Sequence, residues 1–139
     1  MTRLRTMDAT VIKTHEWIQD IQDEGHFKGE QEAYAALRGV LHALRDRLLT
    51  DEVAEMGAQL PIFIRGIYYE GWVPSHTPLK IRTRQDFLDN VASRLPQNID
   101  LMVAIQAVLK VIQRKITDGE INDVKSNLPQ AILELWPES

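Results

Sequence analysis

The feature that most constrains the fold of this chain is an internal repeat with a fixed offset of 68 residues. At this offset several positions in the two halves are identical: Ala36 and Ala104, Val40 and Val108, Leu41 and Leu109, Glu52 and Glu120, Leu60 and Leu128, Pro61 and Pro129. Other pairs keep their apolar character, among them Leu44 with Ile112 and Tyr68 with Trp136. A unit of this length cannot bury its apolar face alone, so the repeat predicts two copies packed on one shared core.

The apolar residues of both copies have helical spacing. In the first copy, intervals of three and four residues separate Leu37, Val40, Leu41, Leu44 and Leu48, and an equivalent stripe runs through 104–116. This spacing is typical of an amphipathic helix. Thr50, followed by two acidic residues, is predicted to be the N-cap of the next helix. The Leu-Pro pairs at 60–61 and 128–129 are expected to end that helix and to place proline at the first position of another.

The segment 61–69 is ambiguous by itself, because its β-branched and aromatic residues also suit a strand. Its counterpart, 129–136, contains good helix formers, so we predict a helix at both places. Gly71, Pro74 and Pro78 indicate an irregular linker, with a brief extended segment from 79 to 82, before Thr83 and Asp86 form a capping box.

These patterns predict an all-α fold of two tandem four-helix repeats packed as one helical bundle. The expected organisation is one domain, 1–139, with repeat one at about 9–70, a linker at about 71–83 and repeat two at about 84–137.

Composition excludes several classes of function. The chain of 139 residues has no cysteine, which rules out disulfides, thiolate zinc sites and cysteine nucleophiles. A net charge of −4 makes a nucleic-acid partner unfavourable. No uncharged run approaches the ~18 residues of a membrane span, so we expect no membrane association and a cytoplasmic location.

The usual signatures of catalysis and cofactor binding are absent from the sequence. His15, His26, His42 and His76 lack metal-ligand spacing, and no GxSxG, Walker-type or GxGxxG element occurs. We therefore expect no metal site, no cofactor and no catalytic constellation, which favours a protein that is not an enzyme.

A cationic row in the first copy is the first candidate binding surface. Arg38, His42 and Arg45 are spaced to share one helix face, which we expect to lie roughly opposite the apolar stripe. Such a face suits a carboxylate, a phosphate or an acidic partner surface. The alternative, which we favour, is a solvated face with ordinary ion pairs. The second copy has Gln106, Lys110 and Gln113 instead, so any role of the row is specific to the first copy.

An aromatic segment is the second candidate surface. Tyr68, Tyr69 and Trp72 surround Glu70 and precede His76 in the linker. The segment is interpreted either as a binding platform on a rigid loop or as a plug in the seam between the copies. We favour the plug, because Tyr68 has an apolar counterpart in the second copy.

Three stretches resemble one known family. They are AYAALRGVLHALRDRL, QLPIFIRGIYYEGWVPSHTPLKIRTRQDFL and LPQAILELWP, of which 68–78 is the most specific. Together they resemble the bacterial family called domain of unknown function 2267. The resemblance implies an all-helical bacterial domain in a cytoplasmic setting, without an assigned activity or mapped catalytic residues.

The leading hypothesis for function is a non-enzymatic protein-interaction or regulatory module. It binds an unknown protein partner through the row at Arg38, His42 and Arg45 or through the loop at Trp72. The alternative is a binding protein or enzyme for a small anionic ligand, with a site between the repeats lined by His42, Tyr68, Glu70 and the arginines. Nucleic-acid binding through 80–84 is a weaker option, and homodimerisation is left open by the sequence.

Overall fold

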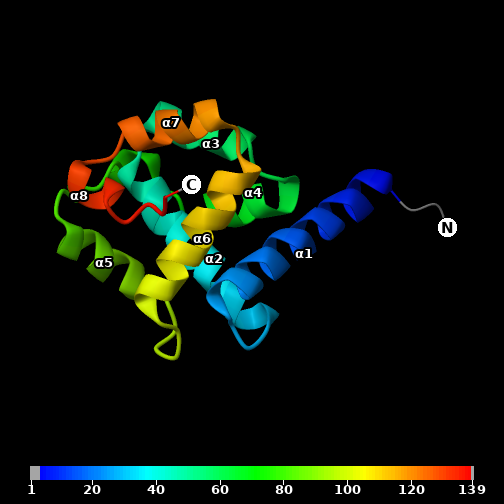
Figure 1. The fold of residues 1–139 in the computed structure, drawn as a ribbon. Coiled ribbons are helices and arrows are strands. Elements are labelled where there is room, and N and C mark those ends of the chain that lie inside the picture. Colours follow the sequence, from blue (N-terminus) through cyan, green and yellow to red (C-terminus); the bar gives the residue numbers. More distant parts are fainter. Residues whose placement is uncertain (1–3, 139) are drawn as a thin grey trace.

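The computed structural model describes residues 4–138, and these contain eight α-helices, one short 3-10 turn and no strand (Figure 1). The helices are α1 (Arg5–Gly25), α2 (Glu30–Arg47), α3 (Thr50–Ala58), α4 (Ile62–Tyr69), α5 (Arg84–Ala92), α6 (Leu101–Lys115), α7 (Asp118–Ser126) and α8 (Gln130–Leu133). The 3-10 turn η1 (Pro74–His76) lies between α4 and α5. The predicted all-α class is confirmed.

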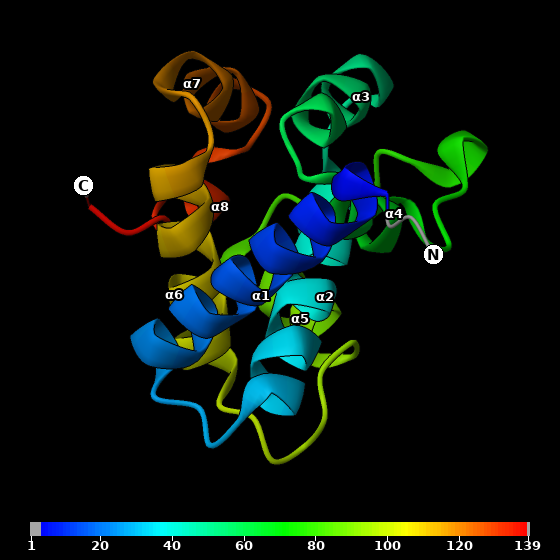
Figure 2. The ribbon, with the colours of Figure 1, turned by 90° about the vertical axis from the view of Figure 1, so that its right-hand side faces the viewer.

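The bundle is centred on α1, α2 and α6, which pack against one another (Figure 2). Helices α3 and α7 meet at one end, while α4 and α5 pack on α2. The buried side chains form one cluster that spans both halves of the chain. Leu41 on α2 and Ile105 on α6 are among its fully buried members. Within residues 4–138, no helix has both the length and the apolarity needed to cross a bilayer.

Several local predictions are confirmed. The ambiguous segment is the helix α4, the linker is irregular apart from η1, and the Thr83 hydroxyl accepts a hydrogen bond from the Asp86 amide at 3.1 Å. Residues 79–82 form no strand, and the Leu79 amide donates to the Asp46 carbonyl at 2.8 Å. The bounds of α3 and α7 differ by 68 residues at both ends. The duplication itself stays a prediction.

Two predicted helix starts are wrong by one residue. Leu49 is the N-cap of α3 and Thr50 is its first helical residue, so the Thr50 hydroxyl does not cap the helix. Thr117, 68 residues after Leu49, does cap α7 by accepting from the Glu120 amide at 3.3 Å. The turn position is thus shared by both halves, and only the second half has a hydroxyl there. Pro61 and Pro129 are likewise N-caps rather than first residues, because their extended ψ angles delay the helix.

Candidate functional site

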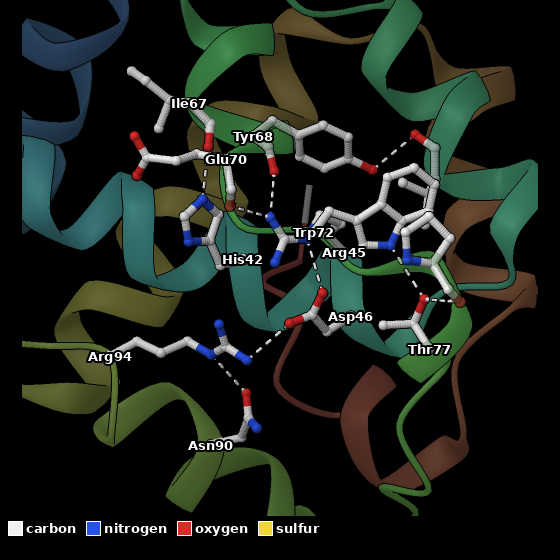
Figure 3. A network of polar contacts seen from close by, with 12 residues as sticks. His42, Arg45, Asp46, Ile67, Tyr68, Glu70, Trp72, Thr77, Asn90 and Arg94 are labelled. Atoms are coloured by element: carbon white, nitrogen blue, oxygen red, sulfur yellow. Dashed lines mark hydrogen bonds and ion pairs between the residues drawn. The ribbon is translucent and has the colours of Figure 1, made fainter.

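The cationic row of α2 holds the C-terminal end of α4. A helix leaves its last carbonyls without intrahelical donors, and buried carbonyls need partners from elsewhere. His42 Nε2 lies 2.6 Å from the Ile67 carbonyl oxygen. Arg45 Nη1 donates to the carbonyls of Tyr68 at 2.7 Å and Glu70 at 2.8 Å (Figure 3). We call His42, Arg45 and these three carbonyls the α4 clamp.

The network continues from the clamp into the second half of the chain. Arg45 Nε donates to Asp46 Oδ1 at 2.8 Å, and Asp46 Oδ2 accepts from Arg94 Nη2 at 2.9 Å. Arg94 Nε in turn donates to Asn90 Oδ1 of α5 at 2.9 Å (Figure 3). Arg45 is only 2% exposed, so its charge needs the Asp46 carboxylate and the carbonyls around it. The network therefore ties α4 and α5 to α2.

The charge state of His42 follows from this environment. Burial lowers the pKa of its imidazole, the hydrogen bond to the Ile67 carbonyl partly opposes this, and Arg45, Arg38 and Arg94 lower the pKa further. The ring is therefore neutral at neutral pH. Because a carbonyl oxygen can only accept, we assign the remaining proton to Nε2.

The expectation that Arg38, His42 and Arg45 share a face opposite the apolar stripe is wrong for two of the three. His42 is 4% exposed and Arg45 is 2% exposed. The stripe faces α1 and α6, but α4 and α5 cover another side of α2, so this helix is buried on several sides. Only Arg38 is exposed, and it donates to Glu70 Oε1 at 2.6 Å, which lowers the pKa of that carboxyl. A binding role for Arg38 stays a prediction.

The aromatic segment fastens α4 and the linker to α3. Tyr68 is fully buried, and its hydroxyl donates to the Val53 carbonyl at 2.9 Å. Tyr69 contacts Tyr68 edge-on with ring centroids 5.0 Å apart, and Trp72 lies 5.7 Å beyond. Trp72 Nε1 donates to Thr77 Oγ1 at 3.1 Å (Figure 3). These partners all belong to the first half rather than to the seam between the halves. His76 is exposed in η1, and its role in binding stays a prediction.

One surface was missed by the sequence analysis. The apolar residues of α1 follow a spacing of three and four through positions 4, 7, 11, 14, 18 and 21. The later positions of this stripe are buried, but Leu4, Met7 and Val11 are 66%, 61% and 50% exposed. Ile62 and Phe63, at the start of α4, are also more than half exposed. The Phe63 amide donates to Thr10 Oγ1 at 3.1 Å, which places this end of α4 against α1.

We call Leu4, Met7, Val11, Ile62 and Phe63 the α1–α4 apolar patch. The signal in the sequence was the helical stripe beginning at Leu4, before the repeat itself begins. An exposed apolar group of this kind on a small domain marks a candidate interaction surface.

A shallow hollow of about 530 Å³ lies against α6 and α7. Its lining includes the cations Lys110, Arg114 and Lys125 and the acids Asp118 and Glu138. Arg114 is already paired with Glu24 at 2.7 Å. None of the residues expected to line an anion site between the repeats is among its walls.

Taken together, the geometry describes an all-α domain in which a buried polar network locks two helices onto a third and an apolar patch remains at the surface. The chain belongs to DUF2267, a family of uncharacterised conserved proteins, whose model matches residues 14–135. No protein with a curated description matches it. The family description carries no activity, so the function has to be inferred from the surfaces of the molecule.

Proposed function

We propose that this protein is a non-enzymatic interaction module that binds one amphipathic helix of a partner protein on the α1–α4 apolar patch. The observation that carries the proposal is the apolar stripe of α1, which is buried in its second half and uncovered in its first. Leu4, Met7 and Val11 are at least half exposed, although the same stripe is buried from Thr14 onward.

The shape of the patch favours a helix as the occupant. The covered part of the stripe, with Ile18 and Ile21, packs in a region where α1 contacts α2 and α6. The uncovered part repeats the same spacing of three and four residues. A surface with this periodicity accepts the ridges of another helix, as its continuation does inside the bundle. Ile62 and Phe63 add apolar area beside it.

The contacts of the cationic row support the choice of this surface. His42 and Arg45 are engaged with the carbonyls of α4, and Arg38 is paired with Glu70. Their hydrogen bonds and charges are used within the molecule. The exposed apolar side chains of the patch are the groups that gain free energy on association, because binding removes them from water.

Site-specific photo-cross-linking tests the proposal. A photoreactive amino acid at Met7 is expected to give one discrete adduct in the source cells, with the cross-link mapped to an amphipathic helix of another protein. Val11→Glu should abolish the adduct by placing a charge in the apolar contact, while Val11→Leu should retain it. The same photoreactive residue at Gln97, which is exposed in the turn before α6, serves as the control.

Three results would contradict the proposal. They are an adduct that contains only a second copy of the chain, an adduct that forms equally well from position 97, and the absence of any adduct that Val11→Glu removes. The melting temperature of Val11→Glu, measured in parallel, must match that of the parent, because position 11 lies on the surface.

A further inference from the structure

Three carboxylates converge where α3 meets α7. Glu52 and Glu55 belong to α3, Glu120 belongs to α7, and one oxygen of each lies within 4.8 Å of the others. Glu52 and Glu120 are each the third residue of their helix and stand 68 positions apart. The packing of α3 on α7 therefore brings two equivalent positions of the repeat pattern face to face.

Two of the three carboxylates are buried without compensation. Glu52 is 7% exposed and Glu120 is 8% exposed. Oε1 of each is shielded from solvent and accepts no hydrogen bond. Within residues 4–138, no Lys, Arg or His forms an ion pair with any member of the cluster. A buried carboxylate without a counter-charge is costly, so the cluster must take up either a proton or a cation.

A surface hollow of about 390 Å³ adjoins the cluster. Its walls are Leu49, Thr50, Asp51, Glu52, Glu55 and Asn127, which provide oxygen atoms and no cationic side chain. The hollow gives access from solvent and has room for the water molecules that hard divalent cations retain. Asp51 adds a further negative charge beside it.

The local field also favours a cation. The N-terminal ends of α3 and α7 each supply about half a positive charge. Three ionised carboxylates outweigh these two helix ends by about two negative charges.

We propose that Glu52, Glu55 and Glu120 form a site for a hard divalent cation, Ca²⁺ or Mg²⁺, that ties α3 to α7. The donor atoms are all oxygen, as both ions prefer, and neither sulfur nor imidazole is in the cluster. Oxygens within 4.8 Å of one another can share an ion whose bonds to oxygen are about 2.4 Å long. Sequence motifs miss the site because its ligands come from both halves of the chain.

The proton is the competitor of this cation. Burial, followed by the neighbouring Glu120 and Glu55 carboxyls, raises the pKa of Glu52 to about 9. Glu52 therefore carries a proton at neutral pH when no cation is bound. Cation binding has to displace that proton, so binding is expected to strengthen as the pH rises and to release acid.

Thermal unfolding and calorimetric titration of the full chain test the site. After treatment with a chelator, the protein is melted with Ca²⁺, with Mg²⁺ or with neither, at matched ionic strength. We expect one of the two ions to raise the melting temperature by about 5–8 °C at a hundredfold excess over its Kd. Titrations in two buffers of different ionisation enthalpy should show proton release.

Variants separate a site from general screening of charge. Glu52→Gln and Glu120→Gln should melt higher than the parent without cation, because each removes one repelling charge, and should lose the cation response. Glu55→Gln changes an exposed residue, so it keeps the fold intact while weakening binding at least about tenfold. Glu16→Gln, at an exposed position of α1, is the matched control and should respond like the parent.

The proposal is overturned if neither ion changes the melting temperature or releases protons at about millimolar concentration. It is equally overturned if Glu55→Gln responds like Glu16→Gln. The cluster would then be a carboxyl pair that shares a proton and binds no cation.

Discussion

The C-terminal ends of α4 and α8 stand at corresponding places in the two halves of the chain, but they are held very differently. Helix α4 has eight residues, and its last carbonyls are bound by His42 and Arg45. Helix α8 has four residues. The positions equivalent to His42 and Arg45 carry Lys110, which pairs with Glu24 at 3.5 Å, and Gln113, whose buried Oε1 has no hydrogen bond.

The aromatic residues of these two regions show the same contrast. The Tyr68 hydroxyl donates to the Val53 carbonyl. Trp136, 68 residues later, has a buried indole N–H without a hydrogen-bond partner, and Lys125 lies 5.3 Å from its ring centroid. The apolar pattern is similar in both halves, yet only the first half satisfies its buried polar atoms at this place. We infer that polar partners, rather than apolar spacing, determine how firmly each terminal helix is held.

The largest expected effect tests whether the two halves depend on one core at all. Leu41→Asp and Leu109→Asp each place a charge at a position that is at most 2% exposed. Each should unfold the whole domain, because an unpaired buried charge costs more than the domain's total stability can supply. Circular dichroism melts are the measurement. A cooperative transition near that of the parent in either variant would mean that the halves are independent.

The next effect compares Arg45 with its counterpart directly. Arg45→Gln introduces the residue found at position 113 and leaves the Asp46 carboxylate and two carbonyls of α4 without their donor. We expect the free energy of unfolding to fall by about 3–5 kcal/mol. Gln113→Met removes an amide whose oxygen is unpartnered, so it should change stability by less than about 1 kcal/mol. Urea denaturation of both variants measures the difference, and equal losses would contradict the comparison.

The pH dependence of stability should report on His42. Its pKa is lowered in the folded state, so below about pH 6.5 the unfolded chain binds a proton that the folded chain does not. The stabilisation is thus complete above that pH and is lost as the pH falls toward the folded pKa. In His42→Gln this loss, about 1 kcal/mol between pH 7 and pH 5, should disappear. His76→Gln, at an exposed position, is the control and should show the pH profile of the parent.

The smallest effect is expected where the cationic row reaches the surface. Arg38 is 41% exposed in its side chain, and its pair with Glu70 is open to solvent. Such pairs contribute little to stability, so Arg38→Gln should leave the melting temperature unchanged within experimental error. A loss comparable to that of Arg45→Gln would show that the clamp extends to the surface.

Much of the fold was accessible from the sequence, because helical periodicity depends on neighbours within a few residues. The helix at 62–69 followed from its counterpart, and the Thr83 cap followed from a local motif. The burial of Arg45 could not be predicted in this way. Its partners are carbonyls 23 and 25 residues away, and a charged side chain at helical spacing looks the same whether solvent or another helix covers it.

The candidate surfaces show the same limit. The sequence singled out Arg38, His42 and Trp72 by residue type, and the structure shows two of these engaged in internal hydrogen bonds and the third in an ion pair. The apolar patch and the glutamate cluster depend on which parts of a helix are left uncovered and which helices meet. Such relations become visible only when the elements have been packed.

Native-state hydrogen exchange tests the account most directly, because it measures how firmly α4 and α8 are held in the same molecule. We expect the amides of α4 to exchange more slowly than those of α8 in the parent. In Arg45→Gln, protection of α4 should fall to the level of α8, while α6 stays the most protected element. Unchanged protection of α4 in that variant would contradict the claim that the α2 clamp holds this helix.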